Sequence, residues 1–209
     1  MNVIERIRQI GIIPVIRARS SDEALRAVEA IRAGGISVLE ITMTVPGAVQ
    51  VIADLTRRLG DDALIGAGTV LDADAARACV DAGARFVVSP ALDVPTIEAC
   101  RRLGVPVFPG ALTPTEVVTA WKAGADAVKV FPAGAVGGAS YLKSLKAPLP
   151  QIELIPTGGV SLKTAAEFIA AGAMALGVGA DLVSGDPAAI TEKARQYVAA
   201  VAAARGQLS

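Results

Sequence analysis

The runs VLEITM (38–43) and LIGAGTV (64–70) decide the fold, because each is a short apolar stretch that a helical pattern follows. Such runs are typical of buried parallel strands, and they recur at intervals of roughly 20 to 27 residues, the spacing of a strand and helix unit. Eight are present: IIPVIRA (12–18), VLEITM (38–43), LIGAGTV (64–70), FVVSP (86–90), VPVFPGA (105–111), AVKVFPA (127–133), LIPTGGV (154–160) and ALGVGA (175–180).

Eight strands that alternate with helices, without a long linker, predict an α/β fold in which residues 1–209 form a single (β/α)8 TIM barrel domain. An open doubly wound sheet is the alternative. The triplets at 33–35, 82–84, 123–125 and 171–173 carry glycines that are expected to end helices. Ile4, Ile7 and Ile10 have helical spacing, which predicts an extra N-terminal helix at the bottom of the barrel.

The composition excludes several classes of function. Twenty basic and twenty acidic residues give no net charge, and aromatic residues make up 3%, so neither nucleic acid nor a membrane surface is an expected partner. The chain has no histidine, which removes Ser-His-Asp and Cys-His systems and histidine-ligated zinc. The charged N-terminus is unlike a signal peptide, and cytoplasmic localisation is expected. Cys79 and Cys100 are expected to be reduced and packed.

A lysine interrupts the apolar run at 127–133. Lys129 alternates with Ala127 and Phe131 on one face of the expected strand, while Val128 and Val130 point to the other. If the first face is the inner one, the amine projects into the barrel, where burial disfavours the ammonium ion and favours a neutral nucleophile. Such an amine can form a Schiff base with a ketone. The alternative is a lysine that extends from a strand end to solvent.

Glu40 raises the same question with the opposite charge. A carboxylate within an apolar strand should have a raised pKa, and a carboxylate and an amine at one barrel mouth are a plausible acid–base pair. The alternative is a partner in a structural ion pair.

The ends of four other strands suggest binding residues. The loops PTGGV (156–160) and GVGAD (177–181) follow the seventh and eighth runs, where barrels most often bind phosphate. Arg17 could supply a fixed positive charge, and Thr69 a hydroxyl for a small carboxylate; an arginine packed on the rim and an ordinary strand-end threonine are the alternatives.

These motifs together resemble a known family. PVIR (14–17), GGISVLEIT (34–42), IGAGTV (65–70), FVVSP (86–90), PGALTPTE (109–116), KVFPA (129–133), PTGGV (156–160) and GVGADLV (177–183) are similar, in order and spacing, to the class I 2-keto-3-deoxy-6-phosphogluconate (KDPG) and 4-hydroxy-2-oxoglutarate (KHG) aldolases. The similarity covers nearly the whole chain. It implies a homotrimeric barrel lyase, without metal or other cofactor, that reversibly cleaves KDPG to pyruvate and glyceraldehyde 3-phosphate.

The resemblance also implies roles for individual residues. Lys129 matches the Schiff-base lysine and Glu40 the acid–base glutamate. The expected substrate-binding residues are Thr69, which matches the threonine at the pyruvate carboxylate, Phe131, and the phosphate-loop residues Gly158, Gly159, Gly179 and Ala180. Arg17 matches an arginine of the 2-keto-3-deoxy-6-phosphogalactonate branch.

Two positions depart from the common family pattern. Thr44 stands where many members have an arginine near the bound carboxylate, and Ala180 stands where a serine is common, so only its backbone N–H can contact a phosphate. The alternative functions are therefore cleavage of 4-hydroxy-2-oxoglutarate or of the phosphogalactonate epimer. A phosphate-binding barrel isomerase and a non-enzymatic assembly scaffold derived from the family are the more distant alternatives.

Overall fold

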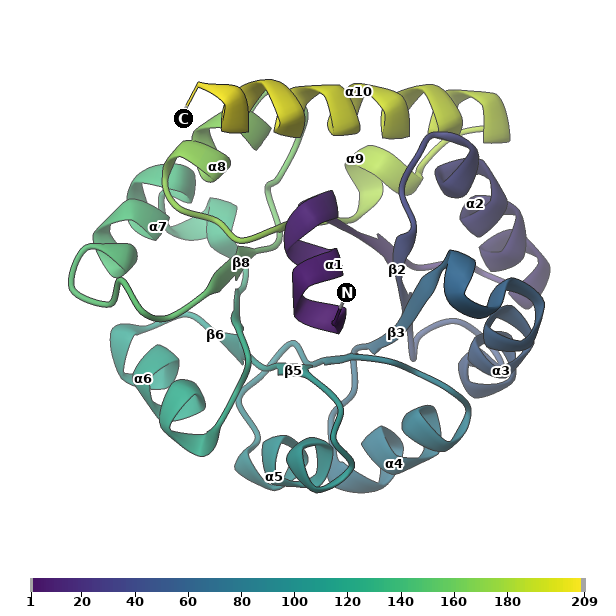
Figure 1. The fold of residues 1–209 in the computed structure, drawn as a ribbon, viewed down its shortest axis with the longest axis horizontal. Coiled ribbons are helices and arrows are strands. Elements are labelled where there is room, and N and C mark those ends of the chain that lie inside the picture. The colour runs from purple at the N-terminus through teal and green to yellow at the C-terminus, as the bar shows by residue number, and fades with distance from the viewer. Residues whose placement is uncertain (1, 208–209) are drawn as a thin grey trace.

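The computed structural model describes residues 2–207, along which parallel strands and helices alternate (Figure 1). Every predicted run contains a strand, and the run at 105–111 contains two. The strands are β1 Ile12–Ile16, β2 Val38–Thr42, β3 Leu64–Gly68, β4 Val87–Val88, β5 Val107–Phe108, β6 Gly110–Ala111, β7 Val128–Val130, β8 Leu154–Pro156 and β9 Leu176–Val178.

Helices connect most of the successive strands. The helices are α1 Val3–Ile10, α2 Ser21–Ala33, α3 Ala48–Leu59, α4 Ala73–Asp81, α5 Val94–Arg102, α6 Pro114–Ala123, α7 Gly138–Lys146, α8 Ala165–Ala170, α9 Ala180–Val183 and α10 Pro187–Gly206, with 3-10 turns at Gly60–Asp62 and Ala133–Val136. Helix α1 precedes β1, and α9 and α10 follow β9. Side chains of Ser20, Asp72 and Thr113 cap the starts of α2, α4 and α6 by accepting backbone N–H bonds. The predicted helix ends at the four glycine-containing triplets are confirmed.

The strands form a curled parallel sheet. Six strands pair in the order β5-β4-β3-β2-β1-β9 and three in the order β6-β7-β8. Pro109 separates β5 from β6 within one run, because proline has no N–H for the ladder. Between β8 and β9 lie isolated bridges at Leu154–Ala173 and Thr157–Gly177. Helices α2 to α8 and α10 surround the convex side, whereas an open doubly wound sheet carries helices on both faces (Figure 1).

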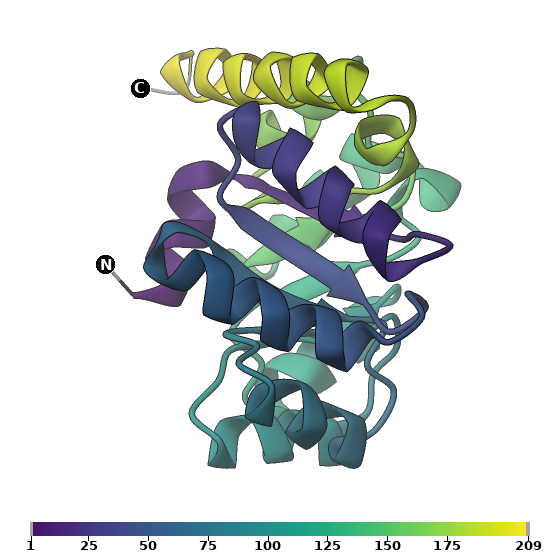
Figure 2. The same cartoon turned by 90° about the vertical axis from the view of Figure 1, so that its right-hand side faces the viewer.

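Two clusters of buried side chains separate the faces of the sheet. Val128 and Val130 belong to the outer cluster beneath the helices, while Ala127 belongs to an inner cluster with Phe86, Phe108 and other apolar residues. The predicted alternation along β7 is therefore confirmed, and the lysine between the two valines is directed to the inside. Figure 2 shows the outer layer from the side, where α10 lies beside α2.

The N-terminal segment closes one end of the inner cluster. Ile7 of α1 is fully buried and packs with Ile13, Val38 and Leu64, which lie at or near the starts of their strands. Figure 1 shows α1 in the middle of the ring of strands. The opposite end of the interior, where the strands have their carboxyl ends, is left for polar side chains.

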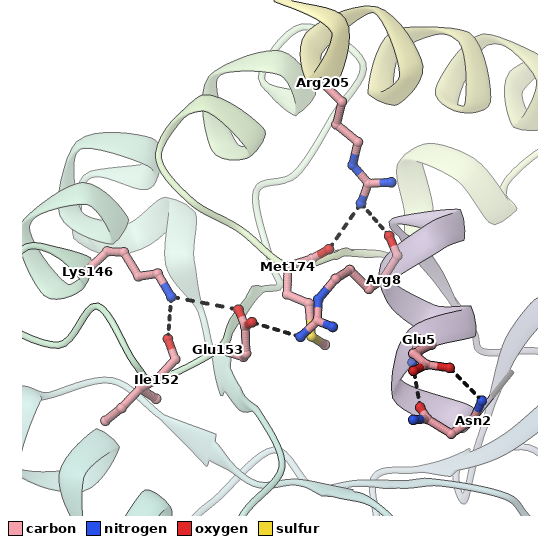
Figure 3. A network of polar contacts seen from close by, with 8 residues as sticks. All are labelled: Asn2, Glu5, Arg8, Lys146, Ile152, Glu153, Met174 and Arg205. Carbon is pink, nitrogen blue, oxygen red and sulfur yellow. Dashed lines mark hydrogen bonds and ion pairs between the residues drawn. The ribbon is translucent and has the colours of Figure 1, made fainter. Parts of the chain in front are cut away.

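Arg205 ties the end of α10 to this closed end (Figure 3). Its guanidinium donates to the carbonyl oxygens of Arg8 (2.6 Å), Gln9 (2.8 Å) and Met174 (3.2 Å). Beside it, Glu153 accepts from Arg8 at 2.9 Å and lies 3.7 Å from the Lys146 amine. Within residues 2–207, no helix has the length and apolar character that crossing a membrane requires.

Candidate active site

Lys129 lies inside the curled sheet, on the middle residue of β7. Only 2% of the residue is exposed. Its amine lies 5.3 Å from the centre of the Phe131 ring, one residue beyond the end of the strand. An aromatic face at this distance attracts a cation and leaves the other side of the amine free to face a substrate. The alternative of an amine that extends to solvent is therefore wrong.

Glu40 lies inside the sheet on β2 and is also 2% exposed. Its Oε1 atom is buried and has no hydrogen-bond partner among the residues that the structure describes. Burial raises the pKa of this carboxyl above its ordinary value of 4.5, and the nearby charges of Lys129 and Arg17 lower that pKa by smaller amounts. A buried oxygen without a hydrogen bond lowers stability, so such atoms are rare and are often retained for a function. The predicted rise in the pKa of Glu40 is confirmed.

The carboxyl group of Glu40 occupies space that Gly68 leaves open. A β-carbon built on Gly68 would lie 1.9 Å from Oε1 of Glu40. Gly68 pairs with Thr42, so the neighbouring strand β3 carries this glycine to the level of the carboxylate. The absence of a side chain at Gly68 therefore leaves the room that the carboxyl of Glu40 needs in this position.

A cavity of about 250 Å³ opens at the carboxyl ends of β1, β7, β8 and β9. It brings together six of the predicted residues, since Arg17, Phe131, Gly158, Gly159, Gly179 and Ala180 all line it. Its further lining residues are Val15, Thr157, Val160, Gly177 and Asp181. Lys129 and Glu40 are not among these residues, and lie deeper in the interior.

The β8 loop contributes a backbone that only glycine adopts readily. Gly158 and Gly159 have φ values of 81° and 80°, in the left-handed region. A β-carbon on Gly159 would also lie 2.7 Å from the Cα of Gly134. Two successive glycines therefore let this loop fold tightly over the cavity and present its backbone there.

The β9 loop reaches the cavity through a short helix. Gly179 precedes α9, and its carbonyl oxygen accepts from the N–H groups of Leu182 and Val183. The first N–H groups of a helix have no partner within it, so those of Ala180 and Asp181 are available on this side. Ala180 is exposed and, as its identity requires, offers no hydroxyl.

Thr69 stands apart from that cavity. It follows Gly68 at the end of β3, with a φ of 59° that is rare for any residue other than glycine. Strained backbone of this kind is concentrated at functional sites. Thr69 does not line the cavity with the other predicted residues, so the structure places it on another part of the rim.

Thr44 stands where many family members have an arginine, and it contributes a hydrogen bond but no charge. Thr42 uses its one proton to donate to the carbonyl oxygen of Ile16 at 2.9 Å, so the 2.7 Å contact between the two threonines has Thr44 as the donor. Arg17 is exposed at the mouth of the cavity, and its positive charge, like that of Lys129, lowers the pKa of Glu40.

Two lining residues with polar side chains, Thr157 and Asp181, have no assignment from the sequence. Thr157 follows β8 and is buried, and it lies in the quoted loop PTGGV as a polar residue at the end of an apolar run, the signal that singled out Thr69. That signal could have found it. Asp181 lies within the quoted loop GVGAD, but only the structure shows that it lines the cavity.

The curled parallel sheet, with a buried amine and a buried carboxyl inside it, fits a class of lyases, the aldolases that act through a lysine. Comparison with known proteins agrees. A sequence model described as KDPG and KHG aldolase matches residues 3–201. The chain therefore belongs to the KDPG and KHG aldolase family.

Individual relatives extend this comparison. The 2-dehydro-3-deoxy-phosphogluconate aldolase of Haemophilus influenzae is 37% identical over 168 residues, covering 80% of this chain and 79% of the relative. The 2-dehydro-3-deoxy-6-phosphogalactonate aldolase of Escherichia coli is 38% identical over 175 residues, covering 83% and 85%. A crystal structure of the Legionella pneumophila KDPG aldolase, with pyruvate captured as a covalent carbinolamine, has 31% identity, 98% coverage of both chains and a TM-score of 0.82.

Proposed function

We propose that this protein is a class I aldolase that cleaves KDPG reversibly to pyruvate and glyceraldehyde 3-phosphate. The observation that carries the proposal is the pair formed by Lys129 and Glu40: both are 2% exposed, their charges interact, and Oε1 of Glu40 has no partner within the described chain. The family relatives named for this substrate support the choice of keto acid.

Lys129 forms the covalent intermediate. Its neutral amine attacks the C2 ketone to give a carbinolamine, which loses water to become a protonated imine. The C3–C4 bond then breaks, its electron pair neutralises the imine nitrogen, and an enamine and the aldehyde remain. Protonation at C3 and hydrolysis of the imine release pyruvate and free the amine.

Glu40 moves the protons in this sequence. As a carboxylate it takes the proton of the C4 hydroxyl, directly or through a water, and as an acid it returns a proton to C3 of the enamine. Its raised pKa suits both roles, because each protonation state is then accessible closer to neutral pH. The space above Gly68 fixes the carboxyl during these transfers.

The remaining residues bind the substrate. Thr69 contacts the carboxylate of the keto acid, and Phe131 packs beside the reacting carbons. The phosphate lies in the cavity beside Gly158, Gly159, Gly179 and Ala180, where backbone N–H groups approach an anion closely. Arg17 adds a positive charge at the mouth of the same cavity.

The position of Arg17 favours one second candidate, cleavage of 2-keto-3-deoxy-6-phosphogalactonate. This residue lines the cavity, and a relative named for that epimer is 38% identical. The two substrates differ in configuration at C4, next to the bond that breaks. Cleavage of 4-hydroxy-2-oxoglutarate remains a further outcome, since it needs no phosphate site.

The experiment is a coupled assay of pyruvate release from the three keto acids at one enzyme concentration. KDPG is expected to have the highest kcat/KM, and Lys129→Ala to abolish release. Lys122→Ala, which removes an exposed lysine of α6, is the control and should retain activity. A highest kcat/KM for either other substrate would correct the proposed specificity. A protein that assembles but releases pyruvate from none of the three would be a scaffold.

The wider proposal is a single domain over residues 1–209, a closed (β/α)8 barrel with α1 as an extra helix at its bottom. The bridges between β8 and β9, and the continuous chain through β5 and β6, support closure. We place this enzyme in the cytoplasm, since both cysteines are free and buried. A homotrimer is the proposed assembly, and four exposed large apolar side chains, Leu71, Leu103, Trp121 and Val198, offer surface for it.

A further inference from the structure

A buried tyrosine holds the short helix beside the anion cavity. Tyr197 of α10 is fully buried, and its hydroxyl donates to Oδ2 of Asp181 at 2.6 Å. On the other side, Oδ1 of Asp181 lies 3.9 Å from the amine of Lys193, also on α10. Asp181 is the second residue of α9, immediately after Ala180. These contacts therefore tie the first turn of α9 to a long helix of the outer layer.

The hydrogen bond from Tyr197 to Asp181 is well suited to holding α9 in one position. Burial first, and then the carboxylate of Asp181, raise the pKa of Tyr197, so that its hydroxyl stays protonated and donates. A hydrogen bond to a charged acceptor is about twice as strong as a neutral one. Tyrosine has few rotatable bonds, and its ring is enclosed by the packing of α10, so the donor is already oriented.

Helix α9, the segment that this hydrogen bond holds, needs such an anchor. Helix α9 has four residues, and Gly185, with a φ of 117°, follows it closely. Leu182 anchors α9 by apolar burial. Because Ala180 has no hydroxyl, this part of the loop can bind an anion only through backbone N–H groups, whose position depends on α9 itself.

We infer that Tyr197 is a positioning residue for the phosphorylated end of the substrate and acts through Asp181. The inference rests on the proposed function and deepens it. Tyr197 does not line the cavity, and its hydroxyl bonds to Asp181 rather than to Lys129 or Glu40. Loss of its hydroxyl should therefore weaken binding of the phosphate and leave the chemical step unaffected.

The test compares KDPG with 4-hydroxy-2-oxoglutarate, which has no phosphate. For Tyr197→Phe we expect the KM for KDPG to rise about tenfold, the size of effect that one hydrogen bond to a charged group gives. The kcat for KDPG and both constants for 4-hydroxy-2-oxoglutarate should change by less than about twofold. Asp181→Ala should raise the KM for KDPG by a similar factor. Asp181→Asn should show a much smaller rise, because its amide oxygen can still accept from Tyr197.

Tyr141 provides the matched control. Its hydroxyl donates to the carbonyl oxygen of Leu112, in a loop that does not line the anion cavity. Tyr141→Phe should leave the ratio of the two KM values unchanged. A Tyr197→Phe protein with an unchanged ratio, or with equal losses on both substrates, would overturn the inference; if it does not fold, Asp181→Ala decides by the same ratio. Wild-type protein that releases no pyruvate from KDPG would instead refute the proposed function, and the inference with it.

Discussion

Gly68→Ala should disable the carboxyl of Glu40 while it leaves Lys129 intact. The new β-carbon would lie 1.9 Å from Oε1, 2.5 Å from Cδ and 2.6 Å from Cγ of Glu40, whereas real Cβ contacts are not shorter than 3.0 Å. The carboxyl must therefore retreat by about 1 Å, a displacement that can cost on the order of 10²-fold in rate. The backbone itself tolerates alanine, because Gly68 is absent from the residues with positive φ.

The cost in stability should be similar in size to the cost in rate, which is about 2.7 kcal/mol for a 10²-fold loss. The atoms in the way belong mostly to the end of a flexible side chain, so we expect the free energy of unfolding to fall by about 1–3 kcal/mol. Gly206→Ala is the control, since its β-carbon would meet nothing within 4 Å at the end of α10. It should retain full turnover.

Two measurements on Gly68→Ala decide the matter. Steady-state release of pyruvate from KDPG should fall about 10²-fold in kcat, while borohydride should still trap pyruvate on the protein. Thermal unfolding checks that the variant is folded at the assay temperature. Turnover equal to that of the wild type in a folded variant would refute the placement of Glu40 in the proton transfers.

Three other substitutions test the surrounding account. Burial raises the pKa of Glu40 in the folded protein, so this group favours folding at pH below about 4.5, and its contribution to stability is lost as pH rises through the raised pKa. In Glu40→Gln, denaturant unfolding followed across this pH range should not show that loss of stability. Arg205→Ala loses the hydrogen bonds to the carbonyl oxygens of Arg8, Gln9 and Met174, so the free energy of unfolding in urea should fall by about 2–3 kcal/mol. The exposed Arg26→Ala is the control and should lower it by about 0.5 kcal/mol. Equal urea midpoints for the two variants would contradict this. Arg17→Gln removes a charge that lowers the pKa of Glu40, so the acidic limb of the kcat profile should move to higher pH, and an unmoved limb would exclude the interaction.

The sequence was sufficient to predict the strands, because their apolar runs are continuous and glycines end the helices between them. The division of the fifth run was missed. VPVFPGA (105–111) has the composition of one strand, yet Pro109 cannot donate to the ladder, and the pairing is shared between β5 and β6. Which strands lack regular pairing depends on the curl of the whole sheet, which no local pattern records.

The inward direction of Lys129 was predictable from the two-residue period of a strand, and the raised pKa of Glu40 from its apolar neighbours. The contact of Gly68 with Glu40 was not, because it joins residues on two strands at a level that the register fixes. The bond from Tyr197 to Asp181 spans 16 residues between two helices, and nothing in the local pattern of α10 distinguishes that tyrosine from an ordinary core residue.

The central claim, that Lys129 is the nucleophile, is tested most directly by locating a trapped intermediate. Pyruvate and borohydride are added to the wild-type protein, and peptide mass spectrometry identifies the modified residue. We predict a reduced pyruvate adduct on Lys129, and no adduct in Lys129→Ala. An adduct on another lysine, or an unmodified wild-type protein, would contradict the account.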